Sequence, residues 1–434
     1  MNLVDGKILD MADCDAILNA LNDRVLATLA KPRLEAEVVI RACDKLVASL
    51  DDGVWLPVMK ALGLPAQLGK TRRPEARALF SGDALRHRLQ KELGDNPSQI
   101  RSHTTAEGYT VHEQLLPLGV LLHIAAGNAD GLPAFSVLEG LLTGNINILK
   151  LPAAEGGLSV RLLSALIAIE PALAEYIYVF DYSSKDMGQL KKLIEVADGV
   201  VVWGGIEAVS TFRSLLPVHV KLIEWGHKVS FAYVSTNGVT DDALYGIAAN
   251  IASTGQLLCS SCQGIYLDTG DFGDVCAFCE RFLPLLEKAV GEYAAELPVG
   301  LKAQAALQRR TAELESALNG GRVFKAANCS LIACRDRVLQ PAMGFANAWV
   351  KALPQNGMME TLRPYKNYLQ TAALVSAPQE EAALADLLLK SGVVRVCDGD
   401  SMSKTYSGAP HDGEYPLRRY MRVTTVEARR GVHP

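Results

Sequence analysis

The most constraining feature of this chain is a regular alternation of short β-rich runs and helical runs, which begins near Tyr109. Strands that alternate with helices form βαβ units and a parallel sheet. Such sheets bind ligands beyond the carboxyl ends of their strands, so we expect the functional residues directly after the strands. The predicted strands are 119–124, 147–151, 176–180, 199–203 and 219–223, and the predicted helices between them are 132–142, 158–169, 185–197 and 206–215.

The segments on either side of this alternation carry other patterns. The first hundred residues are predicted to be helical, because apolar residues recur at helical spacing over 12–31, 33–50 and 75–93. A second α/β unit is predicted to begin near Val229, and 417–426 is predicted to be a strand that pairs with another subunit or returns to the first domain. Within the second unit we predict a strand at 229–234, a helix from 241, a strand at 264–268 and a helix at 274–291.

Composition limits the classes of function that need to be considered. The chain has 434 residues with 49% hydrophobic content, which is enough for a large core and for two domains or more. The formal net charge is -5 and no basic stripe is evident, which argues against nucleic acid as a partner. The first residues lack the pattern of a signal peptide, and no apolar run approaches ~20 residues. We therefore expect a cytoplasmic protein without a membrane span.

The nine cysteines do not suggest a disulfide framework, because their number is odd and the sequence shows no secretion signal. Two C-x-x-C pairs, Cys259/Cys262 and Cys276/Cys279, have the spacing of a zinc site. However, Cys276 and Cys279 lie inside the apolar helical pattern VCAFCERFLPLL, which favours one face of a core helix over a zinc knuckle.

Polar residues follow the first two predicted strands. Asn128 ends the run Ile124-Ala-Ala-Gly-Asn128, and its side-chain amide is a neutral donor that suits a developing oxyanion. An ordinary Gly-Asn turn explains this run as well. Lys150 lies at the end of the next strand, where it can reach a ribose hydroxyl or a phosphate. The alternative is a lysine whose charged end extends from the sheet into water.

Two further candidates follow later strands. Gly204 and Gly205 stand between a strand and a helix, where the helix N-terminus can hold a phosphate, although the pattern is not G-x-G-x-x-G. An ordinary strand-to-helix turn is equally compatible. Glu224, directly after the strand at 219–223, can act as a general base or contact the nicotinamide end of a cofactor. A solvated strand end is the alternative reading.

The loop Gly255-Gln-Leu-Leu-Cys259-Ser-Ser-Cys262-Gln263 carries the candidate nucleophile. Cysteine is the strongest nucleophile for an acyl group, and its thioester can then be reduced by hydride. A buried structural cysteine and a zinc ligand are the competing interpretations of Cys259. Cys262 is a neighbouring thiol that could compete for the same role.

Taken together and in this order, these features resemble the aldehyde dehydrogenase superfamily. Within it, the chain is most similar to the acyl-CoA reductases typified by the fatty acid reductase of bacterial bioluminescence. The resemblance covers roughly residues 110 to 427. The segments that carry it are HIAAGN, LLTGNINILKLP, VVWGGIEAV, GHKVSF, QLLCSSCQ, NYLQTAAL and HDGEYPLRRYMRV.

The resemblance implies a role for each matching residue. Cys259 matches the nucleophile, and Asn128 matches the oxyanion-hole amide, helped by the backbone N–H of Cys259. Glu224 matches the glutamate that activates water in hydrolytic relatives. The implied cofactor contacts are Ala125, Ala126, Lys150, Gly204 and Gly205, with the two glycines at the pyrophosphate.

The implied fold is an α/β, aldehyde dehydrogenase-like fold in three parts. N-terminal helices and a Rossmann-like NAD(P)-binding domain occupy 1–227. A catalytic α/β domain with the cysteine occupies 228–400, and a return or oligomerisation segment occupies 401–434. We therefore expect a homo-oligomer.

The implied activity is reduction of an acyl-CoA or another acyl thioester to an aldehyde, through a covalent thioester on Cys259. NADPH is the expected cofactor, with NADH as the alternative. An aldehyde dehydrogenase or an acyl-phosphate reductase that uses the same thiol remains an alternative, as does a non-catalytic nucleotide- or zinc-binding protein.

The chain also departs from the family patterns. The E-x-F-G-P segment of ordinary aldehyde dehydrogenases is absent from the sequence, and Asn367-Tyr-Leu-Gln370 stands near its expected place. The usual G-Q-x-C spacing is stretched between Gly255 and Cys259, and the reductase-like pattern would place Gln at Leu257 and Pro at Cys262.

Overall fold

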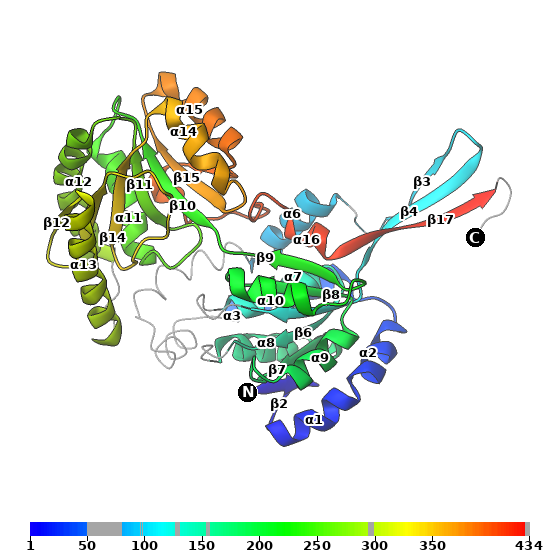
Figure 1. Cartoon of the computed structure of the whole chain (residues 1–434). Helices are drawn as coiled ribbons and strands as arrows, with labels where there is room; N and C mark the ends of the chain where they lie inside the picture. Colours follow the sequence, from blue (N-terminus) through cyan, green and yellow to red (C-terminus); the bar gives the residue numbers. More distant parts are fainter. Residues whose placement is uncertain are drawn as a thin grey trace. The chain divides into compact units, whose positions relative to one another are not determined.

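The computed structural model describes residues 1–49, 80–95, 97, 99–125, 131–152, 157–293 and 299–429 (Figure 1). The chain divides into two compact units. Unit 1 comprises Met1–Gly226 together with Tyr406–Pro434, and unit 2 comprises His227–Thr405. The C-terminal tail therefore belongs to unit 1.

Unit 1 is built on a seven-stranded sheet with the order β2-β1-β7-β6-β5-β8-β9. The five strands from β7 to β9 are parallel to one another, and the short strands β1 and β2 add an antiparallel hairpin at the edge. The strands are β1 (Asn2–Val4), β2 (Lys7–Leu9), β5 (Val120–Ile124), β6 (Ile146–Lys150), β7 (Ile177–Phe180), β8 (Gly199–Trp203) and β9 (Lys221–Trp225).

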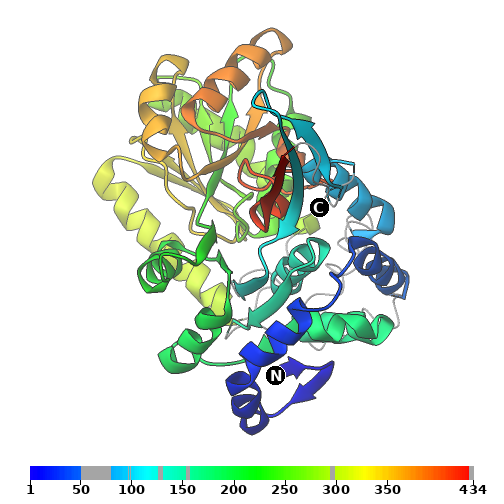
Figure 2. The ribbon, with the colours of Figure 1, turned by 90° about the vertical axis from the view of Figure 1, so that its right-hand side faces the viewer.

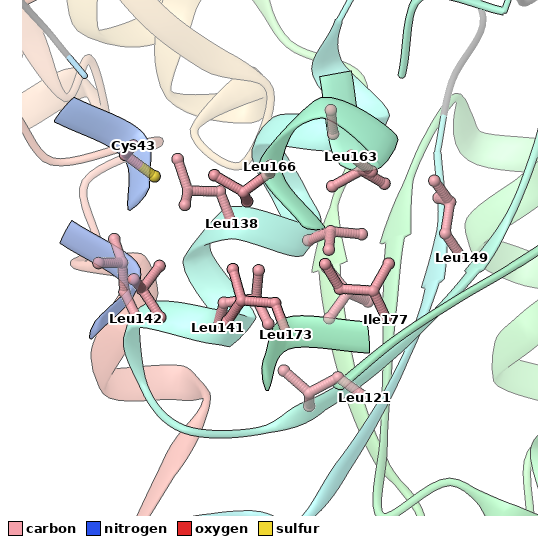
Figure 3. Packing of buried hydrophobic residues seen from close by; sticks show 14 of the residues in the cluster. Cys43, Leu121, Leu138, Leu141, Leu142, Leu149, Leu163, Leu166, Leu173 and Ile177 are labelled. Atoms are coloured by element: carbon pink, nitrogen blue, oxygen red, sulfur yellow. The ribbon is translucent and has the colours of Figure 1, made fainter. Parts of the chain in front are cut away.

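Helices cover both faces of this sheet, which explains why its central strands are continuous apolar runs rather than alternating ones. Figure 3 shows leucines of α7 and α8 packed with residues of β5, β6 and β7 in one of the two core clusters. The helices of unit 1 are α1 (Met11–Asn19), α2 (Leu21–Leu29), α3 (Ala36–Ser49), α6 (Gly82–Leu93), α7 (Leu132–Leu142), α8 (Leu158–Ile169), η1 (Pro171–Tyr176), α9 (Met187–Val196), α10 (Ile206–Leu215) and α16 (Pro416–Arg419).

The prediction that the first hundred residues are helical is wrong at the N-terminus. β1 and β2 form a hairpin, seen in dark blue in Figure 2, and Leu3 of β1 pairs with Val179 of β7. Its turn is Asp5-Gly6, with φ of 50° and 72°. Asp-Gly is the typical sequence of a two-residue hairpin turn, but the flanking strands are too short to show clear alternation. The predicted helix at 12–31 is in fact two helices that meet at Ala20.

Two polar side chains lie inside the sheet of unit 1 and are fully paired there. His123 of β5 is hydrogen-bonded through Nδ1 to the Ser136 hydroxyl at 2.7 Å and through Nε2 to the Asn147 side chain at 3.0 Å. Burial lowers the pKa of His123 to about 4, so the ring is neutral at pH 7. A Cβ at Gly140 would lie 1.7 Å from Asn147 Oδ1, so only glycine lets α7 approach β6 this closely.

The C-terminal tail returns to unit 1 as a strand. β17 (Met421–Arg429) pairs antiparallel with β4 (Tyr109–Pro117), which in turn pairs with β3 (Arg101–Thr104) (Figure 1). Of the two outcomes that the sequence left open for this strand, the structure shows the return to the first unit. The sequence did not predict β3 or β4.

Unit 2 contains a second seven-stranded sheet, with the order β12-β13-β14-β11-β10-β15-β16. All neighbouring pairs are parallel except β12 with β13. Its strands are β10 (Val229–Val234), β11 (Cys262–Leu267), β12 (Arg322–Lys325), β13 (Ser330–Cys334), β14 (Asn347–Ala352), β15 (Leu369–Val375) and β16 (Arg395–Cys397).

Two core clusters fill unit 2, one containing residues of α11 and α12 and the other containing residues of α14 and α15. Cys279 of α12 is buried in the first of these clusters, which confirms that this segment is a core helix. Within the described residues, no three or more His, Cys, Asp or Glu side chains are grouped so that they could hold a metal ion. The helices are α11 (Asp241–Thr254), α12 (Phe272–Tyr293), α13 (Val299–Asn319), α14 (Gln355–Leu362), η2 (Arg363–Tyr365), α15 (Pro378–Ser391) and η3 (Gly399–Ser401).

Among the helices in the described part of the chain, none combines the length and the apolar character needed to cross a membrane.

A buried ion-pair network joins α6, α7 and the tail within unit 1. The guanidinium of Arg88 pairs with the carboxylates of Glu92, at 2.7 Å, and Glu139. The Tyr420 hydroxyl donates to Glu139 at 3.1 Å, and the Leu417 N–H donates to Glu92 at 2.9 Å. Each carboxylate is thus matched by donors, which is the condition under which buried charges are tolerated.

Replacing Arg88 by methionine is expected to destabilise the protein strongly, because Glu92 and Glu139 would lose their shared cation while remaining buried. The free energy of unfolding should fall by about 3–5 kcal/mol. Urea denaturation measures it. Arg86→Met on the same helix is the matched control, because Arg86 pairs with Glu37 at the surface and its loss should change stability little. Equal losses in the two variants would contradict the role given to the network.

Candidate active site

Four of the predicted site residues gather at the carboxyl edge of the unit 1 sheet. Ala125 directly follows β5 and is buried, Lys150 is the last residue of β6, and Gly204 with Gly205 connects β8 to α10. Ala126 and Asn128 lie outside the described residues, so their roles stay predictions. The described four lie at the ends of parallel strands or directly after them, which is where ligands bind in sheets of this kind.

This edge contains a topological switch point. β5 and β8 are neighbours, but the chain proceeds from β5 to β6 on one side and from β8 to β9 on the other. In doubly wound sheets the crevice at such a point is the usual nucleotide site. Ala125 and Gly204 follow the two strands that flank this point.

Gly205 is suited to hold an anion at the start of α10. It occupies the N-cap and has no side chain with which to cap the first-turn N–H groups of the helix. A Cβ built on Gly205 meets no heavy atom of the described residues within 4 Å, whereas one on Gly204 would lie 3.0 Å from Ala208 Cβ. None of the described residues therefore fills the space beside Gly205 at the N-terminus of α10, and a phosphate would find donors there.

Lys150 is held by the loop after β7. Its Nζ donates to the Ser184 hydroxyl at 2.7 Å. Burial lowers the pKa of Lys150, while the nearby Asp181 carboxylate acts in the opposite direction. This arrangement places an ammonium group and a hydroxyl side by side beyond β6 and β7, where they can bind a ribose or a phosphate.

The sequence predicted that Glu224 follows its strand. In the structure Glu224 instead lies within the strand. β9 extends from Lys221 to Trp225, two residues beyond the predicted end, because its register with β8 continues to Trp203. Both carboxylate oxygens of Glu224 bond to Arg213 of α10, with Nε to Oε2 at 3.1 Å. The sequence analysis missed Arg213, since nothing in its spacing connects it with Glu224.

Three aromatic rings lie together at the ends of β8 and β9. The centroids of Trp203 and Trp225 are 5.5 Å apart, and His411 of the tail lies 5.0 Å from each of them. The guanidinium of Arg419 lies 5.0 Å from the Trp225 ring. The tail thereby covers apolar surface next to the Gly204-Gly205 turn and fixes this corner of unit 1.

Cys259 lies in unit 2, in the loop between α11 and β11, where the predicted helix from 241 and the predicted strand at 264–268 also place it. It precedes β11, so it lies at the amino edge of a parallel sheet rather than after a strand. The amino-terminal residues of the neighbouring strands lie beside it in the register, since Ser230 of β10 pairs with Cys262, and Val229 pairs with Leu369 of β15.

The loop that carries Cys259 is fastened to these strands by hydrogen bonds. The Ser230 hydroxyl donates to the Cys259 carbonyl at 2.7 Å and accepts the Thr371 N–H at 3.0 Å. The Cys262 N–H donates to the Asn250 side chain at 2.8 Å. Both ends of the short segment from Cys259 to Cys262 are therefore fixed to the body of unit 2.

Gln256 holds the base of the cysteine loop. Its φ is 63°, directly after Gly255 at 57°, so a non-glycine residue adopts a left-handed conformation that costs free energy. Its side-chain amide donates to the Cys262 carbonyl at 3.0 Å and accepts the Asn347 N–H at 3.2 Å. The side chain of Gln256 is thus buried, and its hydrogen bonds connect the base of the loop to β11 and β14.

The two neighbouring thiols have opposite environments. Cys259 is exposed, whereas Cys262 is buried and its thiol donates to the Gly264 carbonyl. Burial raises the pKa of Cys262 to about 12, which keeps it protonated at pH 7. Since the thiolate is the nucleophilic form, these environments favour Cys259 over Cys262.

A glutamine that the sequence analysis quoted but did not assign contacts the candidate nucleophile. Nε2 of Gln370, the second residue of β15, donates to Cys259 Sγ at 3.2 Å. Gln370 is 7% exposed, so its amide is presented to the sulfur from within the sheet. The two residues are 111 positions apart, and the pairing of β10 with both β11 and β15 brings them together.

The chain is similar to known acyl thioester reductases. The family model for "Acyl-CoA reductase (LuxC)" matches residues 56–423. A long-chain acyl-protein thioester reductase of Aliivibrio fischeri is 27% identical over 319 residues, which cover 72% of this chain and 64% of that protein. One of Vibrio harveyi is 25% identical over 360 residues, which cover 81% and 72%. The chain therefore spans less than two thirds of the length of the Aliivibrio relative.

Solved structures share the fold. An NAD-dependent aldehyde dehydrogenase from Sinorhizobium meliloti superposes with a TM-score of 0.77 at 15% identity, covering 100% of this chain and 95% of that one. An NADP-dependent glyceraldehyde-3-phosphate dehydrogenase from Bacillus halodurans gives 0.71 at 14%, covering 99% and 95%. The predicted aldehyde dehydrogenase-like fold is confirmed. With a family model that matches most of its length, this chain belongs to the acyl-CoA reductase (LuxC) family.

Proposed function

We propose that this protein reduces an acyl thioester to an aldehyde with a nicotinamide cofactor, through a covalent thioester on Cys259. The observation that carries the proposal is the sulfur itself. Cys259 is exposed, its loop is fastened to three strands, and an amide N–H is directed at Sγ from 3.2 Å. The description of the family and the names of the curated relatives support the same reaction class.

The proposed substrate is a long-chain acyl thioester, with acyl-CoA as the donor. The family description names acyl-CoA, whereas the curated relatives are named for acyl-protein thioesters, so both donors belong in the first substrate panel. An acyl phosphate or a free aldehyde could react with the same thiol. Side-by-side assays of the four substrate types separate these activities.

Acylation uses the residues of unit 2. The Cys259 thiolate attacks the carbonyl carbon of the substrate, and the carbonyl oxygen takes up the negative charge. The C–S bond to the donor then breaks, and the donor thiolate leaves with the bonding electrons. The proposed oxyanion donors are the backbone N–H of Cys259 and the side chain of Asn128, whose role follows from the family resemblance.

The cofactor site belongs to unit 1. NADPH, or alternatively NADH, would supply the hydride that reduces the acyl carbon. The N-terminus of α10 at Gly205 fits the pyrophosphate, and Lys150 with Ser184 fits a ribose or its phosphate. Glu224, held by Arg213, would position the nicotinamide end rather than activate water, since water must be excluded from a thioester that is to be reduced.

Release of the product returns the enzyme to its starting state. Reduction of the acyl thioester consumes one hydride and one proton, and it yields the aldehyde and the Cys259 thiol. When the C–S bond to Cys259 breaks, the sulfur leaves with the bonding electrons, at the position where the Gln370 amide donates.

We also propose that the protein is a homo-oligomer. In the three-stranded sheet β17 is an edge strand, and its Val423 and Val426 are 65% and 51% exposed. An exposed edge strand with apolar side chains is a template for pairing with another chain.

Cys259→Ala is expected to abolish aldehyde formation from acyl-CoA, with a loss of about 10³-fold or more, because no thioester can form. Cofactor binding, followed by the fluorescence of the reduced nicotinamide, should remain. Cys262→Ala is the matched control and should retain most of the activity, since that thiol is buried. Turnover close to wild type in Cys259→Ala would refute the mechanism.

Gly205→Asp tests the cofactor site. Aspartate is a good N-cap, so it should bond to the first-turn N–H groups of α10 and leave stability unchanged or improved. The same carboxylate would occupy the phosphate position and repel the cofactor, and the Kd for NADPH should rise by about tenfold or more.

The control for this variant is Gly270→Asp, which adds the same charge at a position in unit 2 where a Cβ also has space. Fluorescence titration gives both constants. An unchanged Kd in Gly205→Asp would show that the pyrophosphate binds elsewhere.

A further inference from the structure

The contact between Gln370 and Cys259 is supported by the local geometry of the sheet. Val229 of β10 pairs with Leu369, but Phe231 pairs with Ala372, so β15 has one more residue than β10 in this interval. The irregularity falls at Gln370 and Thr371. Such bulges redirect a side chain, and here the redirected amide reaches Cys259 Sγ at 3.2 Å.

A second irregularity lies on the other side of β10. Ser230 pairs with Cys262, but Ala232 pairs with Ile265, so β11 also carries an extra residue next to Ser230. The Ser230 hydroxyl bridges the two neighbours at this point, bonding to the Thr371 N–H and to the Cys259 carbonyl. The donor of Gln370 and the backbone of Cys259 are thereby held in one rigid arrangement.

The chemistry of a glutamine at this place differs from that of an acid or a base. Its amide N–H can donate to sulfur, and such a donor favours the negatively charged form. The group carries no charge and does not titrate, so its effect is the same at every pH. It also cannot accept the proton of the thiol as an imidazole would.

We infer that Gln370 is a catalytic residue that stabilises Cys259 as the thiolate, both before attack on the substrate and when the sulfur leaves the product. The inference deepens the proposed function and rests on it for the reaction. The contact itself can be tested without substrate.

Among the described residues, the charged groups on the elements around this loop include Lys228, Asp400, Lys404 and Arg395. Lys228 donates to the Asn367 carbonyl at 3.0 Å, ahead of β15. Asp400 and Lys404 pair with each other at 2.7 Å, and Ser403 of the same segment contacts Ser260. Arg395 bonds to the carbonyls of Met402, Ser401 and Lys404. Variants of Gln370 leave these four charged groups unchanged. A difference in Cys259 reactivity between the variants is therefore due to the amide of Gln370.

The test measures the rate at which iodoacetamide alkylates Cys259 as a function of pH. Mass spectrometry identifies the modified residue, and Cys259→Ala is the labelling control. Gln370→Met keeps the length of the side chain but removes the donor. The midpoint pH of alkylation should rise by about one unit. Gln370→Glu replaces the donor by a carboxylate and should raise the midpoint further.

Gln355→Glu is the matched control, because it adds the same charge at the start of α14, after the carboxyl end of β14 in the same sheet. Its midpoint should equal that of the wild type. An unchanged midpoint in Gln370→Met, in protein with the unfolding temperature of the wild type, would overturn the inference. A raised midpoint in an enzyme that reduces no acyl thioester would uphold the stabilisation of the Cys259 thiolate by Gln370 and would refute the proposed function, together with the part that Gln370 plays in that reaction.

Discussion

The site of unit 2 depends on the hydroxyl of Ser230. A single oxygen accepts the N–H of Thr371 and donates to the carbonyl of Cys259, so it joins β10, β15 and the cysteine loop. The side chain is buried, and both of its bonds are made inside the protein. Because the two neighbouring strands are irregular at this point, the hydroxyl takes the place of ladder hydrogen bonds that the bulges interrupt. The exposed sulfur is thus supported by a rigid base.

The two units place their functional groups at opposite edges of their sheets. Unit 1 presents Lys150 and Gly205 beyond the carboxyl ends of parallel strands, where helix N-termini provide unpaired N–H groups for anions. Unit 2 presents Cys259 at the amino edge, where the loop from α11 enters β11. We propose the first edge for an anionic nucleotide and the second for a nucleophilic sulfur.

Much of the fold followed from periodicity. The bounds of α7, α8, α10, β8 and β10 agree with the predicted ranges, because these elements are strongly apolar and are bounded by glycine or polar residues. The β1–β2 hairpin was missed because strands of three residues show too little alternation.

The candidate site was less predictable than the fold. Cys259, Lys150 and Gly205 were chosen as candidates because their residue type and neighbours suggest chemistry. Gln370 was not assigned because Cys259 lies 111 residues away, and Arg213 was missed because nothing in its spacing connects α10 with Glu224 of β9. The loop of Cys259 was correctly placed between a helix and a strand, although the rule for ligand sites in parallel sheets refers to the opposite edge.

The most direct test of the central claim is to trap the acyl group on the protein. The enzyme is incubated with a long-chain acyl-CoA in the absence of nicotinamide cofactor, and fragment ions then locate the added mass. The account predicts one acyl group per chain, carried on Cys259 and released as aldehyde when NADPH is added. An acyl group on Cys262, or aldehyde formation without any acylated cysteine, would contradict it.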